Sequence, residues 1–90
     1  MSKVRIPQPL RKYAEGQKAI ESRGETAGAA LRELTSKYPQ LADFIFLDAT
    51  SLQSSIHVFL NETEIRSLQG LDTPLAPEDT LIIVIGISGG

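Results

Sequence analysis

The sequence predicts an α+β domain: a mixed sheet of four or five strands with one main helix packed on one face. Two observations lead to this fold class. A single helical apolar stripe, in residues 27–38, stands between short segments that alternate polar and apolar side chains as strands do. The most apolar run of the chain, Leu81 to Ile85, comes near its end and is typical of a central strand. Ninety residues are enough for one domain with a small core.

The first part of the chain is expected to form two strands joined by a loop. Residues 3–6 and 17–21 have strand patterns. Pro7 and Pro9 lack an N–H group, so they limit the length of the first strand. The connecting loop, about ten residues long, is expected to be exposed at its tip, which holds Arg11, Lys12 and Tyr13.

The main helix is expected to begin after Thr26, whose hydroxyl can cap the first turn. Pro39 disfavours helical geometry at Tyr38, so the helix should end there. Gly28 in the first turn lowers helix propensity, and we expect it to allow close packing against the sheet. The apolar stripe consists of Ala27, Ala30, Leu31, Leu34 and Tyr38.

The second part of the chain is expected to contain a short helix over residues 40–46, with Leu41, Phe44 and Ile45 at helical spacing. A polar loop over 48–55 follows, then strands over 56–60, 63–66 and 80–85, with a turn at Asn61-Glu62-Thr63. The last strand should lie parallel to the first, because the crossover through the helix is then right-handed. This order of elements is that of the β-grasp (ubiquitin-like) fold.

Composition and charge limit the classes of function. The chain has no cysteine, which excludes disulfides, a thiolate nucleophile and a cysteine zinc site. Eight Lys/Arg and four Glu give residues 1–40 a charge of +4, whereas one Arg and seven Asp/Glu give residues 41–90 a charge of −6. This asymmetry can mark a partner surface, or the charges can intermingle as solvated faces after folding. The sequence contains no basic cluster with interleaved aromatic residues, so nucleic acid is not expected as a partner.

No apolar run approaches the roughly 18 residues of a membrane helix, so no membrane role is expected. The first residues lack the apolar core of a signal peptide. We therefore expect a cytoplasmic protein.

The five residues after the last strand are expected to form a flexible tail, residues 86–90, on a domain of residues 1–85. Gly89 and Gly90 have no side chain to pack, and we expect them to keep the tail narrow enough to enter a confined site. Fully extended, the tail reaches roughly 17 Å, enough for the Gly90 carboxylate to enter the active site of another protein. The alternative is an inert, frayed terminus.

Several stretches of the sequence resemble those of a known protein family. The fold order and the terminal Gly89-Gly90 are similar to the ubiquitin-like sulfur carriers of the ThiS/MoaD type, and most similar to the CysO-type carriers among them. One departure is Gly86, where such carriers often have proline, and we expect it to loosen the root of the tail. The other stretches that carry the resemblance are Ile6-Pro7 through Leu10-Arg11 to Gly16-Gln17-Lys18, Gly24-Glu25-Thr26, and Val58 to Arg66 followed by Gly70-Leu71.

The resemblance implies a carrier that is not itself an enzyme and binds no cofactor. An activating enzyme of the ThiF/MoeB type would use ATP to adenylate the Gly90 carboxylate, and a sulfur donor would convert it to a thiocarboxylate. A sulfur-accepting synthase would then take the sulfur. A cysteine synthase-like enzyme is the preferred acceptor, and the large subunit of molybdopterin synthase or an enzyme of thiamine synthesis is the alternative. A JAMM-type metalloprotease would trim the cysteine adduct. A ubiquitin-like protein modifier and a plain binding module remain as alternatives.

Beside Gly89 and Gly90, four residues are expected to contact partners: Phe59, Arg66, Ile87 and Ser88. Phe59 shares the strand face opposite Ile56 and is either exposed for a partner or covered by Tyr13 or a loop. Arg66 either binds a partner carboxylate or pairs with Glu64 or Asp72. His57, the only histidine, is expected to have a surface role. No Asp/Glu/His group has metal-site spacing and no serine has the context of a nucleophile, so we expect no metal and no catalytic residue.

Overall fold

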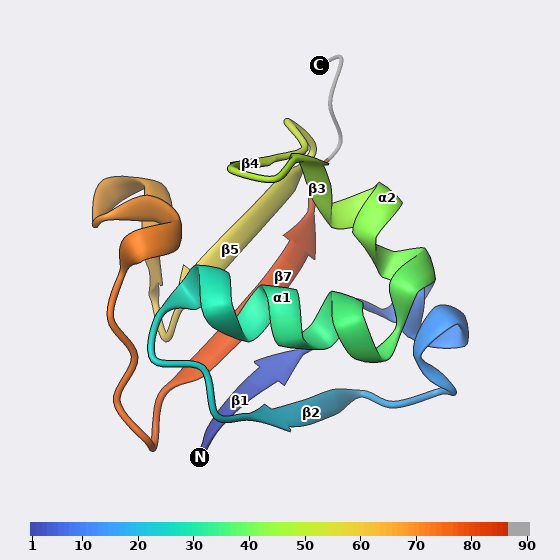
Figure 1. Ribbon diagram of the computed structural model, residues 1–90, viewed down its shortest axis with the longest axis horizontal. Helices are drawn as coiled ribbons and strands as arrows, with labels where there is room; N and C mark the ends of the chain where they lie inside the picture. The colour runs from blue at the N-terminus through green and yellow to red at the C-terminus, as the bar shows by residue number, and fades with distance from the viewer. Residues whose placement is uncertain (87–90) are drawn as a thin grey trace.

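The sheet of the computed structural model has five strands in the order β2-β1-β7-β5-β6 (Figure 1). The structure describes residues 1–86. Strand β7 lies at the centre, parallel to β1 and antiparallel to β5, which confirms the predicted β-grasp arrangement. The strands are β1 (Ser2–Arg5), β2 (Ala19–Ser22), β5 (Ile56–Leu60), β6 (Thr63–Glu64) and β7 (Thr80–Ile85).

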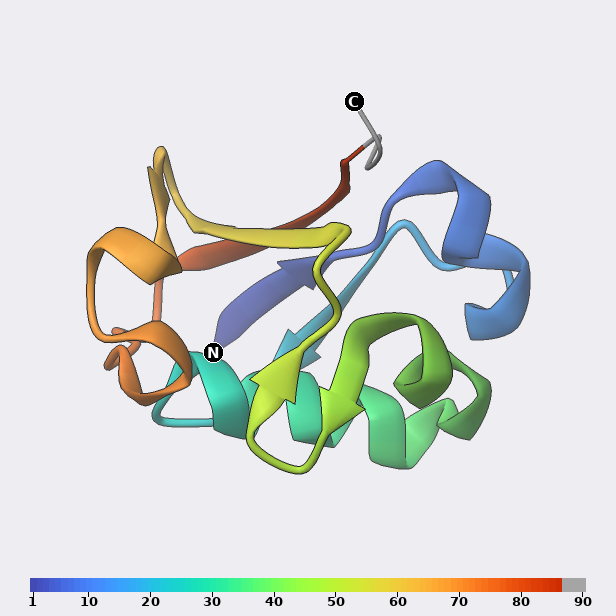
Figure 2. The ribbon, with the colours of Figure 1, turned by 90° about the horizontal axis from the view of Figure 1, so that it is seen from above.

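A second layer covers one face of this sheet. Helix α1 and a small two-stranded sheet lie on the same side, and no described helix lies over the middle of the other face (Figure 2). The elements outside the main sheet are η1 (Gln8–Ala14), α1 (Ala27–Lys37), η2 (Pro39–Leu41), α2 (Ala42–Ile45), β3 (Phe46–Asp48), β4 (Ser51–Leu52), η3 (Ile65–Ser67) and η4 (Gly70–Asp72), where η marks a 3-10 helix.

Helix α1 begins and ends where the sequence predicts. The Thr26 hydroxyl accepts a hydrogen bond from the Ala29 N–H at 3.1 Å, and Pro39 follows the last turn. All five residues of the predicted stripe are buried. The packing partner predicted for Gly28 is wrong: a Cβ there would lie 2.9 Å from the carbonyl oxygen of Leu71, so Gly28 allows close approach of η4, not of the sheet.

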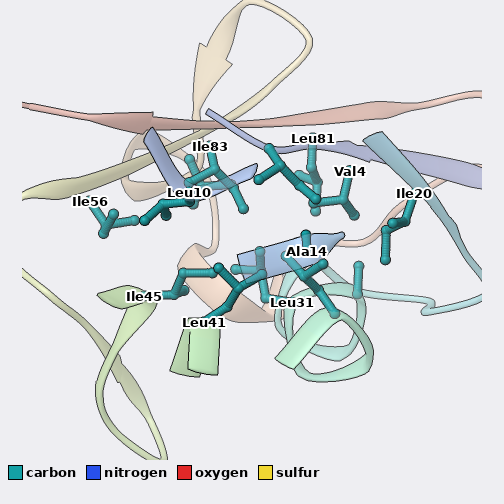
Figure 3. Close-up of a cluster of buried hydrophobic side chains, with 14 of the residues drawn as sticks. Val4, Leu10, Ala14, Ile20, Leu31, Leu41, Ile45, Ile56, Leu81 and Ile83 are labelled. Carbon is teal, nitrogen blue, oxygen red and sulfur yellow. The ribbon is translucent and has the colours of Figure 1, made fainter. Parts of the chain in front are cut away.

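The core lies between α1 and the covered face of the sheet. Side chains of the strands, among them Ile56 and Ile83, point toward Leu31, Leu41 and Ile45 in the other layer (Figure 3). Burial of these aliphatic side chains is the main favourable term for a domain of this size.

The loop predicted between the first two strands is wrong, because residues 8–14 form the 3-10 helix η1. Leu10 and Ala14, four residues apart, are both buried, so this segment closes one end of the core. Pro7 and Pro9 favour this start, since an N-cap and a first turn need no N–H donor there.

The predicted exposed tip of that loop is only partly correct. Lys12 is exposed, but Arg11 is half-buried and its Nε donates to the Ile6 carbonyl at 2.9 Å. Tyr13 packs against the core, with its ring centroid 4.9 Å from that of Phe44.

Residues 46–52 also differ from the prediction. The expected polar loop contains β4, which pairs with β3 in a small hairpin where Phe46 lies opposite Leu52. The backbone and hydroxyl of Thr50 donate hydrogen bonds that lower the pKa of Asp48 in its turn. The short second helix is confirmed with Leu41 and Ile45 buried, but Phe44 is 41% exposed. The strand predicted over 63–66 stops at Glu64, where η3 begins.

The Thr26 cap gives a test of the helix start. Thr26→Ala should lower the free energy of unfolding by about 1 kcal/mol, because the Ala29 N–H loses its acceptor. Urea denaturation measures the change. Ser36→Ala, which also removes a hydroxyl but at an exposed position of the same helix, is the matched control and should change stability by less than about 0.5 kcal/mol. Equal losses in the two variants would contradict a specific cap.

Candidate functional site

Strand β7 is buried on one face only. Leu81 and Ile83 point into the core, whereas Ile82 is half-buried and Val84 is 39% exposed on the other face. The prediction of a central strand is therefore confirmed, and one face of that strand stays open. In the described part of the chain, no second layer covers this side of the sheet (Figure 2).

The uncovered face has an apolar centre. In the register of the sheet Phe59 lies opposite Ile82, and His57 lies opposite Val84. Phe59 is half-buried, and Tyr13 does not cover it because Tyr13 packs on the core side. We call Phe59, Ile82 and Val84 the open-face patch.

One border of the open-face patch is basic. Lys3 and Arg5 of β1 are exposed, and Arg5 lies opposite Ile82 in the parallel pair. An apolar centre with aromatic character and a charged rim is the usual composition of a protein-binding surface. The geometry thus favours the sequence-based expectation that Phe59 contacts a partner.

The end of β7 leads from this patch into the tail. Gly86 lies two residues after Val84, and its N–H donates to the carbonyl of Ser55 at 2.6 Å. Gly86 therefore remains attached to the segment before β5, and the expectation that it loosens the tail is not supported at this position. A proline would remove this donor.

A polar cluster borders Gly86. His57 Nδ1 lies 2.7 Å from Glu64 Oε2, with the two side chains 34% and 27% exposed. Arg66 Nη1 lies 3.9 Å from the same carboxylate oxygen, and Arg66 Nη2 donates to the Ile56 carbonyl at 3.2 Å. Arg66 thus pairs with Glu64, one of the two partners considered from the sequence. We call Gly86, His57 and Glu64 the tail-root cluster.

This cluster was not predicted from the sequence. His57 and Glu64 come together because Leu60 pairs with Thr63, so the hairpin loop consists of Asn61 and Glu62 alone. Asn61 has a positive φ of 57°, as such loops require. The predicted turn had three residues, whereas the loop has two, and this register places Glu64 on the same face as His57.

Four predicted site residues lie outside the described residues: Ile87, Ser88, Gly89 and Gly90. The division into a domain of residues 1–85 and a tail of 86–90 therefore stays a prediction. Within residues 1–86, no group of three or more His, Asp or Glu side chains could hold a metal ion. None of the described helices is both long enough and apolar enough to cross a membrane.

The chain has a β-grasp fold, and its central strand forms part of an open apolar face and leads into the C-terminal segment. These features place it in the ubiquitin-like class of proteins. The chain belongs to the ThiS family, whose sequence model matches residues 4–90.

Comparison with known proteins agrees with this family. The sulfur carrier protein CysO of Mycobacterium tuberculosis is 30% identical over 90 residues, covering 97% of this chain and 96% of that protein. The crystal structure of the BexX/CysO complex of Amycolatopsis orientalis contains a chain that is 27% identical, with a TM-score of 0.89 and 100% of both chains covered. The solution structure of the small archaeal modifier protein 1 of Methanosarcina acetivorans is 33% identical, with a TM-score of 0.84, covering 99% of this chain and 95% of that one.

Two adjacent isoleucines test the different roles of the two sheet faces. Ile83→Ala should lower the free energy of unfolding by about 2–5 kcal/mol, because it leaves a cavity in the core. Ile82→Ala should cost about 1 kcal/mol, because its side chain is half-exposed. Both variants share the lower strand propensity of alanine, so their difference in urea denaturation reports burial alone. Equal losses would show that the open face is covered.

Proposed function

We propose that this chain is a sulfur carrier, a co-substrate on which other enzymes act. The observation that carries the proposal is the Gly89-Gly90 terminus following the central strand of a ThiS-family β-grasp body. The 30% identity to a curated sulfur carrier over nearly the whole chain supports it. The chain supplies the carboxyl group, and the catalytic groups come from its partners.

The chemistry proposed at Gly90 has two steps. Its carboxylate attacks the α-phosphate of ATP in an activating enzyme of the ThiF/MoeB type, and pyrophosphate leaves. A sulfide donor then attacks the acyl carbon, AMP leaves, and a C-terminal thiocarboxylate remains. Adenylation is needed because a carboxylate is a poor electrophile, and the two glycines leave the reacting carbon open to in-line approach.

In a third step, in the cysteine case, the thiocarboxylate sulfur bonds to an activated serine derivative on a synthase, the leaving group of that derivative departs, and the cysteine product stays joined to the Gly90 acyl group. The similarity to CysO-type carriers supports a cysteine synthase-like acceptor, after which a JAMM-type metalloprotease releases the product. The large subunit of molybdopterin synthase or a thiamine-forming enzyme is the alternative acceptor. Since the first step consumes ATP, we place the reaction in the cytoplasm.

The open-face patch is the proposed docking surface for these partners. Phe59 offers an aromatic side chain at its centre, and exposed aromatic residues are enriched in interfaces. Arg66 is 48% exposed and keeps donors available beside its contact to Ile56. Ile87 and Ser88 would contact the channel through which Gly90 reaches the active site.

Deletion of Gly89 and Gly90 tests the carrier chemistry. The wild-type chain, incubated with ATP, sulfide and a ThiF/MoeB-type enzyme, should gain about 16 Da by exchange of one oxygen for sulfur at the activated carboxyl group. The truncated chain should gain nothing, because its terminal carboxylate no longer reaches the active site. Intact-mass spectrometry measures both.

Lys12→Ala, an exposed change in η1, is the control and should gain the same mass as the wild type. Circular dichroism should show the truncated chain folded. Sulfur on the truncated chain would contradict the proposal. A partner that binds the full and truncated chains equally, with no mass gain in either, would favour a plain binding module.

A protein modifier is the second candidate function. The 33% identity to a protein named as a small archaeal modifier supports it. The activated Gly90 carboxyl group would then be transferred to the amine of a lysine in another protein. Because adenylation is common to both functions, only the fate of the acyl group separates them.

Ser88→Arg makes this transfer visible. Arg66 is the last basic residue, so trypsin would leave residues 67–90 on a modified lysine, whereas Ser88→Arg leaves only Gly89-Gly90. If the chain is a modifier, mass spectrometry of cells expressing Ser88→Arg should find diglycine on lysines. The same variant without Gly90 is the control and should give none. Because Ser88 is itself a proposed contact, the wild-type chain decides a negative result: absence of the 67–90 remnant from lysines in wild-type cells would rule against a modifier.

A further inference from the structure

Glycine at position 86 leaves room for the side chain of His57, whereas its own backbone conformation does not demand glycine. The described glycines with positive φ are Gly16 and Gly70, so Gly86 has a conformation open to other residues. A Cβ there would nevertheless lie 2.8 Å from Nε2 and 2.9 Å from Cδ2 of His57. The next atom, the Ser55 carbonyl oxygen, is at an ordinary 3.5 Å. The His57 ring alone therefore occupies the space of a side chain at position 86.

The His57 ring is held in that place from its other side. Its Nδ1 contacts Glu64 Oε2 at 2.7 Å. Because an ionised carboxylate can only accept hydrogen bonds, Nδ1 carries the proton and the Nε2 edge faces Gly86. Arg66 approaches the same carboxylate at 3.9 Å and donates a hydrogen bond to the Ile56 carbonyl, so a network of polar contacts lies behind the ring.

Two contacts thus define where the chain leaves the sheet. The Ser55 carbonyl binds the Gly86 N–H from the segment before β5, and the His57 ring blocks movement toward the open face. The chain end of β7 lies beside the entry to β5 in the ribbon (Figure 1), which brings these groups together although they are far apart in sequence.

We propose that His57 is a positioning residue: its ring, oriented by Glu64, sets the place and direction in which the C-terminal segment leaves the sheet at Gly86. The consequence for activity rests on the proposed carrier function. If only part of the population presents the segment in the direction that the activating enzyme accepts, the apparent affinity falls by that fraction. Once the segment is threaded, His57 has no part in the chemistry.

Hydrogen exchange of the Gly86 amide tests the structural half without any partner. His57→Ala should speed exchange of this amide several-fold, because the bond to Ser55 loses its lateral support. Glu64→Ala should do the same, whereas Glu64→Gln should stay near wild type, since its amide oxygen still accepts from Nδ1–H. Thr80→Ala, on the same face at the other end of β7, is the matched control and should leave the Gly86 amide unchanged.

A double-variant cycle tests the contact itself. Gly86→Ala should displace the ring and speed exchange of the residue 86 amide, but in the His57→Ala background the same change should have little further effect. Additive effects of the two changes would overturn the inference. If His57→Ala is poorly folded, Gly86→Ala alone still tests the contact, because it leaves β5 unaltered, and unchanged exchange of the residue 86 amide would then overturn the inference.

Activation kinetics test the functional half, with one purified ThiF/MoeB-type enzyme that turns over the wild-type chain. His57→Ala and Gly86→Ala should raise the KM for the carrier about threefold to tenfold and leave kcat within about twofold, the pattern of a lost pre-organised state. Unchanged KM in both variants would overturn the inference. If no ThiF/MoeB-type enzyme adenylates the wild-type chain, the proposed function is overturned instead, and the exchange results still decide the role of His57.

Discussion

The parallel pairing of β1 with β7 is the constraint on which the rest of the structure depends. The last strand lies between the first strand and β5, so β7 has a hydrogen-bonded neighbour on each side. This position places the end of β7 beside Ser55 and His57, where two contacts hold Gly86. At an edge of the sheet, the same strand would have lacked one of these neighbours.

Alternate residues of β7 give the two faces of the sheet different roles. Leu81 and Ile83 fill the core under α1, while Ile82 and Val84 form the open-face patch with Phe59. A domain of this size has one helical layer, which can cover only one side of five strands. The side left uncovered is the one that carries the apolar patch, and it runs directly into the segment that ends in Gly89 and Gly90.

Elements with strong local signals were predicted well. The run over 80–85 and the Thr26 cap each specify their structure within a few residues, and both are confirmed. The 3-10 helix η1 was not predicted because Pro7 and Pro9 indicate interruption, and only packing on the core shows that Leu10 and Ala14 share a buried side. The β3–β4 hairpin was missed for a similar reason, since its short strands have no periodic pattern of their own.

By itself the sequence determined the element order, the buried face of α1 and the terminal glycines, because each depends on neighbouring residues and their spacing. Only the tertiary structure decided which sheet face stays open and how the chain leaves it. The contact of His57 with Glu64 needs the hairpin register, in which a shift of one residue would move Glu64 to the other face. The contact of His57 with Gly86 needs the pairing of β5 with β7 across a long stretch of chain, which no local pattern encodes.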